Sequence, residues 1–112
     1  MWERRRFKRY EASIRAEYMK ADGLASIKSL TSTINVSLGG ICAAMSEIIR
    51  EGDELVVKLS LLPEECLATL ARVKWVLPES CRLYKCGLEF TWVSSKQLLD
   101  EYIALASDME TA

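Results

Sequence analysis

Apolar residues recur at every second position through most of this chain, and this pattern limits its possible folds more than any other feature. It runs through residues 12–19, 41–45, 55–61, 66–77 and 84–92. A period of two places alternate side chains on opposite faces of an extended strand, so each segment predicts a half-buried β-strand. Strands that follow one another with no helical segment between them favour an antiparallel sheet or barrel.

The breaks in the pattern fall at short segments of turn-forming residues. Asp22-Gly23 is a pair that tolerates a tight hairpin turn, and a second strand is expected over residues 24–35. The phase of that strand shifts between Ile27 and Leu30, which predicts a β-bulge. Further turns are expected at residues 37–40, 51–53 and 78–80.

Residues 94–112 follow a different pattern. Ser94 and Gln97 have the spacing of a capping box, and apolar residues follow at helical intervals: Leu98, Leu99, Tyr102, Ile103 and Ala106. We therefore expect a C-terminal helix that covers one end or one face of the strands. The predicted fold class is all-β with a C-terminal helix, built as a six-stranded antiparallel β-barrel, because closure removes exposed strand edges.

Length and composition support one domain. A chain of 112 residues, half of them apolar, can bury a core of its own. Its expected parts are a flexible basic arm over residues 1–10, the barrel over 11–93, and the helix and tail over 94–112. No apolar run approaches the ~18 residues that a membrane-spanning helix needs, and residues 1–10 lack the apolar stretch of a secretory signal. We expect a soluble, cytoplasmic protein with no membrane partner.

The net charge of −1 hides an uneven distribution. Residues 1–10 have a net charge of +4, whereas the remaining 102 residues have a net charge of −5. An acidic body repels a polyanion, which argues against a nucleic-acid partner even though a small barrel with a basic arm resembles an oligonucleotide-binding fold. A compact anion held by the arm alone stays open.

The residue inventory argues against an enzyme and against a metal site. The chain has no histidine, so it lacks the commonest general base, the commonest metal ligand and the usual activator of a nucleophilic thiol. Its cysteines show no CxxC spacing, and we interpret all four as reduced, small core residues: Cys42, Cys66, Cys81 and Cys86. Cys42, beside the glycine turn, is the one candidate for thiol chemistry, and no histidine is present to activate it. We expect no cofactor.

Two segments are suited to binding a compact anion. The arm contains Arg5-Arg6-Phe7-Lys8-Arg9, and an arginine fork can grip a phosphate or the O6/N7 edge of guanine with two parallel hydrogen bonds. The segment Asn35-Val36-Ser37-Leu38-Gly39-Gly40 places an amide and a hydroxyl with the same parity at a strand end, while a glycine permits close backbone approach. Taken separately, the arm is weak evidence, because such clusters are usually solvated charge runs. The second segment by itself is better interpreted as an ordinary turn.

Together, the two segments resemble the signature of the PilZ domain family, RxxxR followed by [D/N]xSxxG. Weaker similarities continue in Ala71-Arg72-Val73-Lys74-Trp75-Val76 and Cys86-Gly87-Leu88-Glu89-Phe90. The resemblance implies a PilZ-type six-stranded antiparallel barrel with a C-terminal helix, in agreement with the periodicity. It further implies a stand-alone bacterial receptor or adaptor that binds cyclic di-GMP and signals, through ordering of the arm, to an unidentified effector protein.

The resemblance also implies roles for particular residues. Arg5 and Arg9 would bind phosphate oxygens and the Hoogsteen edge of guanine. Asn35 and Ser37 would bind the other guanine face or its ribose, and Gly40 would let the backbone close in.

In PilZ domains, the position before RxxxR influences whether one dinucleotide or a stacked pair is bound. That position is Arg4, which resembles the class that binds two molecules of cyclic di-GMP per chain. Arg4 and Arg6 would then offset the additional phosphate charges.

Trp75 has two open interpretations. Its indole could stack on a purine, or it could be a core residue, because it shares parity with Val73 and Leu77. The stripe of Tyr84, Phe90 and Trp92 is interpreted as core. The alternative function is a PilZ-fold interaction protein that does not bind the nucleotide, although the loss of RxxxR or NxSxxG would be its expected mark.

Overall fold

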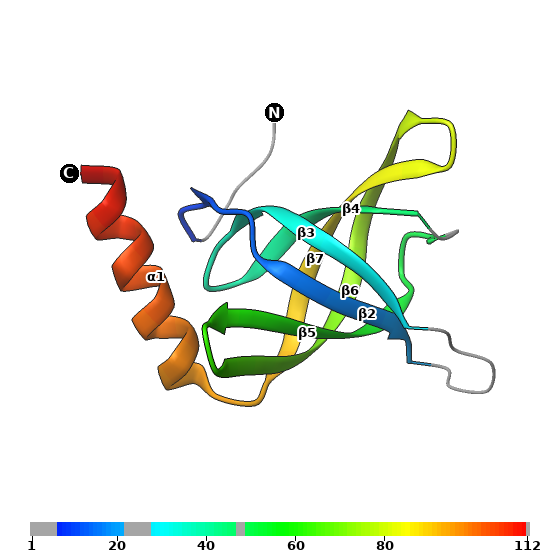
Figure 1. Ribbon diagram of the computed structural model, residues 1–112. Coiled ribbons are helices and arrows are strands. Elements are labelled where there is room, and N and C mark those ends of the chain that lie inside the picture. The colour runs from blue at the N-terminus through cyan, green and yellow to red at the C-terminus, as the bar shows by residue number, and fades with distance from the viewer. Residues whose placement is uncertain (1–6, 22–27, 47–48, 112) are drawn as a thin grey trace.

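The computed structural model describes residues 7–21, 28–46 and 49–111. Within these residues the chain forms seven β-strands and then one α-helix (Figure 1). Their bounds are β1 Tyr10–Glu11, β2 Arg15–Lys20, β3 Ser29–Val36, β4 Gly40–Met45, β5 Glu54–Leu62, β6 Glu65–Ser80, β7 Leu83–Val93 and α1 Lys96–Thr111.

The strands close into an antiparallel barrel. Hydrogen-bonded neighbours follow the order β3-β2-β5-β6-β7-β4, and β4 pairs with β3 to complete the circle. The two-residue β1 pairs with the end of β3, beside β2 on the same edge of that strand. The predicted six-stranded barrel with a C-terminal helix is therefore confirmed (Figure 1).

Alternate residues of each strand fill the barrel, as the period of two requires. In β5 the buried positions are Leu55, Val57, Leu59 and Leu61, each at most 6% exposed. Tyr18 of β2 is also buried, and its hydroxyl accepts a hydrogen bond from the Ser46 amide at 3.1 Å. The core cluster draws on every strand from β2 to β7 and on the helix.

A buried threonine bridges the interruption between β1 and β2. Thr33 Oγ1 donates to the carbonyl of Ala12 at 2.6 Å and accepts from the amide of Ile14 at 2.9 Å. These bonds satisfy backbone groups that would otherwise be buried unpaired where the two strands are interrupted. They hold the start of the barrel, and with it the arm that precedes β1, against β3.

Two bulges turn outward three large side chains that the alternation of the sequence places on the inward face. The pairing of β6 with β7 shifts between Val73 and Trp75, so Trp75 and Leu77 turn to the outer face, and Leu77 is 55% exposed. It shifts again between Leu70 and Ala71, and Trp92 is 53% exposed beside Leu70. The assignment of Trp92 to the core is wrong, and Leu77 does not keep the inward parity of Val73, because one extra residue in a strand exchanges its two faces.

The turn predicted at residues 78–80 is also wrong. Strand β6 continues through Pro78, which pairs with Tyr84, and the chain reverses at Cys81 and Arg82, where Arg82 has φ 63°. Beyond Arg72, β6 pairs with β7 alone, and a proline is tolerated on such an open strand edge. The β6–β7 hairpin consequently projects beyond the barrel (Figure 1).

The helix begins one residue later than the capping box predicts. Ser95 Oγ accepts from the amide of Leu98 at 3.1 Å and is the helix cap, while Ser94 Oγ accepts from the amide of Ala68 at 3.0 Å and extends the sheet. Leu99 and Ile103 enter the core, in agreement with the predicted helical spacing. In the described part of the chain, no helix is long and apolar enough to span a bilayer.

The remaining predictions concern two turns, the bulge and the four cysteines. The predicted turn at residues 51–53 is present, with Gly52 at φ 91°. The irregularity seen on β3 lies between Thr33 and Asn35, whereas Ile27 and the predicted Asp22-Gly23 turn lie outside the described residues. Cys42 and Cys86 are buried as predicted, but Cys66 and Cys81 are exposed, because both lie at hairpin ends rather than on inward strand positions.

Candidate functional site

The described part of the basic arm lies against the turn between β3 and β4. A Cβ at Gly39 would lie 2.7 Å from Cδ2 of Phe7, so the phenyl ring rests on the bare glycine backbone. The ammonium of Lys8 lies 5.2 Å from the centre of the Tyr10 ring, a cation–π contact that fixes the arm at β1. Phe7 is 43% exposed and therefore covers the turn from outside.

Arg9 joins the two sequence motifs directly. Its Nη1 donates to Oδ1 of Asn35 at 2.9 Å, across 26 positions of sequence. Its Nε is buried and has no hydrogen-bond partner among the described residues. A buried donor without an acceptor costs about 1–3 kcal/mol, so an acceptor reaching this atom would be bound favourably.

The side chain of Ser37 holds the turn together. Its Oγ accepts from the amides of Gly39 and Gly40, both at 3.1 Å, and its own amide donates to the Gly40 carbonyl at 2.9 Å. Ser37 is 3% exposed, whereas Asn35 is half-buried. The sequence expects both side chains to face a ligand, but the Ser37 hydroxyl serves the backbone because it follows the strand end and turns inward.

Gly40 is required by the packing of β4 on β7. A Cβ there would overlap the carbonyl oxygen of Leu88, and no rotation of a side chain could relieve a clash with backbone. The neighbouring Gly39 carbonyl accepts from the Phe90 amide at 2.8 Å, which ties the turn to the same strand. The backbone at Gly40 therefore approaches strand β7 closely.

Four residues form a continuous row across the outer face of the barrel. The register places Asn35 opposite Cys42, Cys42 opposite Gly87, and Gly87 opposite Trp75. The adjacent row consists of core residues: Val36, Ile41, Leu88 and Val73. Since strand faces alternate, the first row, which we call the site row, lies on the outside.

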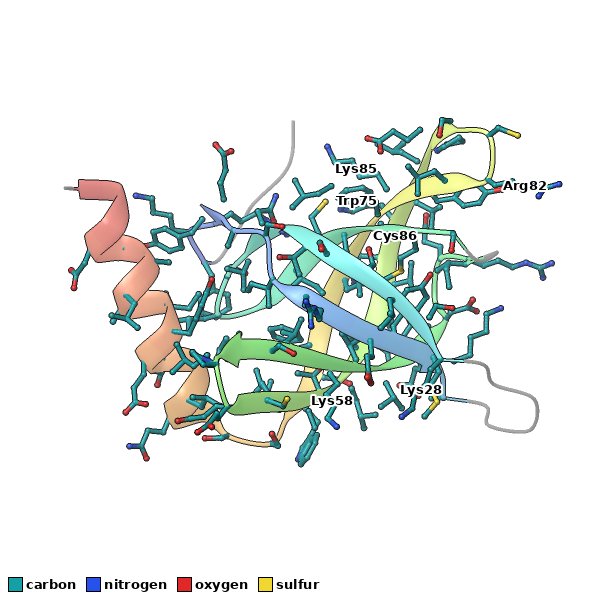
Figure 2. The ribbon with its side chains drawn as sticks, in the orientation of Figure 1. Lys28, Lys58, Trp75, Arg82, Lys85 and Cys86 are labelled. Carbon is teal, nitrogen blue, oxygen red and sulfur yellow. The ribbon has the colours of Figure 1, made fainter. Side chains whose placement is uncertain are left out.

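Trp75 closes one end of the site row. A Cβ at Gly87 would overlap the indole, so the ring packs directly against that glycine on the outer face of the barrel. Trp75 is half-buried and is not part of the core cluster, which favours a binding surface over a core role. Lys85 lies beside it on β7 and adds a positive charge (Figure 2).

The site row spans four strands at a spacing of about 4.8 Å, and so is about 14 Å from Asn35 to Trp75. One end carries the Arg9 guanidinium and the Asn35 amide, and the other carries an aromatic ring with Lys85 beside it. Such a surface has hydrogen-bond donors and a positive charge at one end and a stacking platform at the other. It is suited to a flat, anionic ligand.

The buried Cys86 thiol stays protonated at neutral pH. Burial and, to a smaller extent, the neighbouring Cys42 thiol raise the pKa of Cys86 to about 11. The thiolate, which is the reactive form, is therefore suppressed. Cys42 is 1% exposed, which makes it a packed floor of the site row rather than a nucleophile.

The structure describes some of the predicted site residues, and it places two further residues, Gly87 and Lys85, beside Trp75. Arg4, Arg5 and Arg6 lie outside the described residues, while Arg9, Asn35, Ser37, Gly40 and Trp75 are described. The motifs give no role to Lys85 or to Gly87, although Gly87 lies in one of the weaker similarities to the family. A glycine at an outward position of an otherwise regular strand is the signal that could have found Gly87, because it marks close approach of another group.

The family model of the PilZ domain matches residues 3–105 of the chain. A comparison with curated protein sequences finds no match.

Several solved structures share the fold. The inhibitor of motility MotI/DgrA of Bacillus subtilis superposes with a TM-score of 0.73 at 22% identity, over 96% of this chain and 53% of that one. The PilZ domain of YcgR from Escherichia coli, solved with c-di-GMP, gives 0.71 at 14% identity over 97% and 93% of the two chains. The K. pneumonia MrkH–c-di-GMP complex gives 0.63 at 15% identity over 98% and 52%. The chain thus spans about half the length of MotI and MrkH.

Proposed function

Because the chain belongs to the PilZ domain family, we propose that it is a receptor for cyclic di-GMP that passes the signal to a partner protein. The observation that carries the proposal is the pairing of Arg9 with Asn35 beside the site row, with Nε of Arg9 buried and unpartnered among the described residues. Two of the structurally similar proteins, YcgR and MrkH, were solved with this dinucleotide.

Arg9 supplies the anion-binding group. Its Nη1 is held by Asn35, which orients the planar guanidinium. The edge formed by Nε and Nη2 would bind the ligand once the groups that bury Nε move aside. That edge matches two phosphate oxygens, or O6 and N7 of guanine, with two parallel bonds. Binding there would also give the buried Nε a hydrogen-bond acceptor. The ligand-bound state is then favoured, because the free protein leaves this atom without an acceptor among the described residues.

Trp75 supplies the stacking surface, and its indole lies over Gly87 on the same outer face. Stacking of a base on an aromatic ring contributes about 1–3 kcal/mol. Ser37 and Gly40 take positioning roles in this scheme, because they shape the turn that carries Asn35 and supports Phe7.

The arm arginines would complete the site. Arg5 would contact phosphate and guanine with Arg9, and an arginine at position 4 favours two stacked dinucleotides, whose additional phosphate charges Arg4 and Arg6 offset. Ordering of the arm over the site row would then present a new surface to an effector protein. The contacts of Phe7 with Gly39 and of Lys8 with Tyr10 support this, because they already anchor the arm at its barrel end.

The test is a calorimetric titration of the protein with cyclic di-GMP at moderate salt. Wild type should bind, Arg5→Ala and Arg9→Ala should lose binding, and Arg50→Ala should bind as wild type does, since Arg50 is exposed near the turn at Gly52. A ratio near two ligands per chain would support the role of Arg4. If wild type neither releases heat nor gains thermal stability with the nucleotide, the proposal is wrong and the alternative is a PilZ scaffold that binds only protein.

A further inference from the structure

A second row of outward residues crosses the barrel, and all four of its members are apolar. The register places Met19 of β2 opposite Val56 of β5, Val56 opposite Leu70 of β6, and Leu70 opposite Trp92 of β7. We call this set the apolar row. Such a row is unusual on the exposed face of an antiparallel strand set, where polar residues normally alternate with the core.

The apolar row is exposed and lies away from the site row. Trp92 is 53% and Leu70 39% exposed, and Met19 and Val56 are half-buried. Figure 2 shows Lys58, two residues from Val56 on the same face of β5, on the opposite side of the barrel from Trp75. A contiguous apolar surface of this kind marks an interaction site when polar residues border it.

Charged residues of both signs border the apolar row. On one side, Arg72 pairs with Glu54 at 3.6 Å, with both side chains about half exposed. On the other side, Lys28 pairs with Glu17 at 3.9 Å, and Lys58 is exposed. A border that alternates in sign can complement a second copy of itself, whereas a border of one sign would select an oppositely charged partner.

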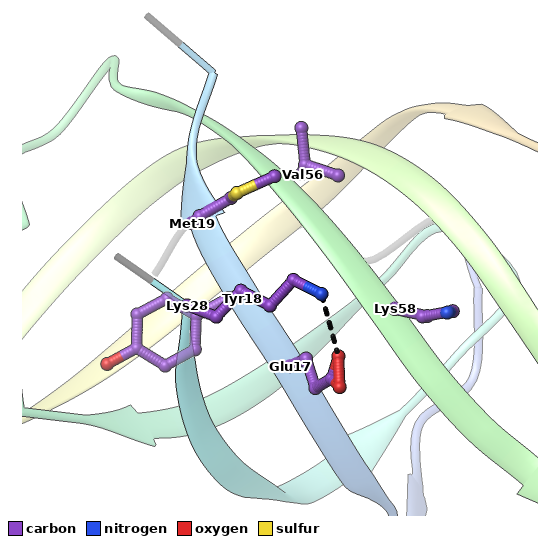
Figure 3. A pocket seen from close by; sticks show the side chains of 6 residues that line it. All are labelled: Glu17, Tyr18, Met19, Lys28, Val56 and Lys58. Atoms are coloured by element: carbon purple, nitrogen blue, oxygen red, sulfur yellow. Dashed lines mark ion pairs between the residues drawn. The ribbon is translucent and has the colours of Figure 1, made fainter. Parts of the chain in front are cut away.

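A shallow groove of about 180 Å³ opens beside the Met19 end of the apolar row (Figure 3). Met19 and Val56 form its apolar side, and Glu17, Lys28 and Lys58 form its charged side. Trp92 projects at the other end of the row. The row therefore has a projecting aromatic group at one end and a receiving groove at the other, as a self-complementary surface requires.

We propose that the apolar row is a homodimer interface. A two-fold axis between β5 and β6, parallel to both, places β5 of one copy over β6 of the other. Val56 then meets the partner's Leu70, and Met19 meets the partner's Trp92, a favourable sulfur–aromatic contact. Glu54 meets the partner's Arg72, and because the axis is two-fold every contact occurs twice.

The size of the surface sets the strength of the dimer. Four strands and five residues along β5 span about 14 Å by 13 Å. This area of about 180 Å² is less than a quarter of the about 800 Å² per chain that a standard stable interface buries, so the dimer is weak and depends on protein concentration. The site row lies on the other side of the barrel, and the inference does not depend on nucleotide binding.

Sedimentation of the full chain over a concentration series, with a reductant to exclude disulfides through Cys66 and Cys81, measures the dimer. Wild type should shift from monomer to dimer as concentration rises. Leu70→Glu should raise the dissociation constant at least about tenfold, while Leu77→Glu, at a more exposed apolar site outside the row, should leave it unchanged. Circular dichroism confirms that each variant is folded. A wild type that stays monomeric throughout, or equal weakening by both variants, would overturn the proposal.

A mixing experiment tests the arrangement of the two copies. Glu54→Arg alone and Arg72→Glu alone each place like charges across the two-fold axis and should weaken the dimer. An equimolar mixture of the two variants restores both opposite-charge contacts between chains, while the pair within each chain stays repulsive. The mixture should therefore dimerise more strongly than either variant. If it does not, Glu54 does not face Arg72 of a second copy and the proposed interface is wrong.

Discussion

Arg9 and Asn35 are joined by a hydrogen bond of 2.9 Å from guanidinium Nη1 to amide Oδ1. The bond connects a residue of the N-terminal arm to the end of β3 and leaves the Nε of Arg9 buried without an acceptor among the described residues. The Arg9 side chain is thus oriented before any ligand binds, which lowers the entropic cost of binding at that residue.

Replacing Arg9 should remove most of the nucleotide affinity. A hydrogen bond to a charged group contributes about 1.5–3 kcal/mol, so Arg9→Ala should weaken binding of cyclic di-GMP at least about tenfold. Arg9→Lys should recover little, because an ammonium cannot form two parallel bonds. Calorimetry measures both, with Arg50→Ala as the matched loss of one exposed arginine. Equal affinity in Arg9→Lys and wild type would contradict the fork geometry.

Asn35→Asp should keep or raise the affinity. The carboxylate would form a charge-assisted bond with Arg9 in place of the neutral amide, and it accepts from guanine N–H groups with two oxygens instead of one. Asn35→Ala, which releases Arg9, is the control and should lose affinity. A large loss in Asn35→Asp would show that the amide N–H of Asn35 donates to the ligand.

Trp75→Ala should weaken binding by about 5- to 150-fold, the equivalent of the about 1–3 kcal/mol that base stacking contributes. Trp75→Phe should retain most of the affinity because it keeps an aromatic face. Trp92→Ala is the matched control, since Trp92 is exposed on the apolar row away from the site row. A result in which Trp75→Ala and Trp92→Ala have the same affinity would remove the stacking role.

Gly40→Ala should destabilise the fold by about 3 kcal/mol or more, because the new Cβ overlaps the Leu88 carbonyl and backbone must move. Gly52→Ala is the comparison. Its Cβ would meet nothing within 4 Å, and its cost is the about 1–2 kcal/mol of a left-handed conformation at φ 91°. Denaturant unfolding measures both. The order of the two losses is the test, and a smaller loss at Gly40 would contradict the packing of β4 on β7.

The free energy of unfolding should decrease between pH 9 and 11 because the Cys86 thiol ionises more readily in the unfolded chain. Its thiol ionises near a pKa of 9.0 in the unfolded chain and about 11 in the folded protein, where burial and then the Cys42 thiol oppose the charge. Raising the pH through this window therefore favours the unfolded state, by up to about 2–3 kcal/mol. Below pH 9, wild type should be more stable than Cys86→Ala, which leaves a small cavity.

The stability difference between wild type and Cys86→Ala should shrink as the pH rises through that window, measured by denaturant unfolding with reductant present. Cys66→Ala is the control, because Cys66 is exposed and its removal should leave the pH dependence as in wild type. A constant difference between wild type and Cys86→Ala from pH 8 to 11 would contradict the raised pKa.

The local patterns of the sequence were sufficient for the barrel and for its motifs. Alternation in β5 predicts its inward residues without exception, since no bulge interrupts that strand from Leu55 to Leu59. The motif spacing predicts that Arg9 and Asn35 belong together, and the structure places them in contact. Both signals depend on residue order alone, through the period of a strand and the chemistry of a side chain.

The tertiary structure decided which face each large side chain occupies. Trp75 and Trp92 have inward parity in the sequence, yet the bulges of β6 and β7 turn both outward, one into the site row and the other into the apolar row. A bulge arises from the pairing of two strands, so neither strand contains a sufficient signal of it. The same holds for Ser37, whose hydroxyl the turn uses, and for Gly87, whose purpose depends on an indole from another strand. Sequence order thus determines what each strand can do, and the register between strands determines where its side chains point.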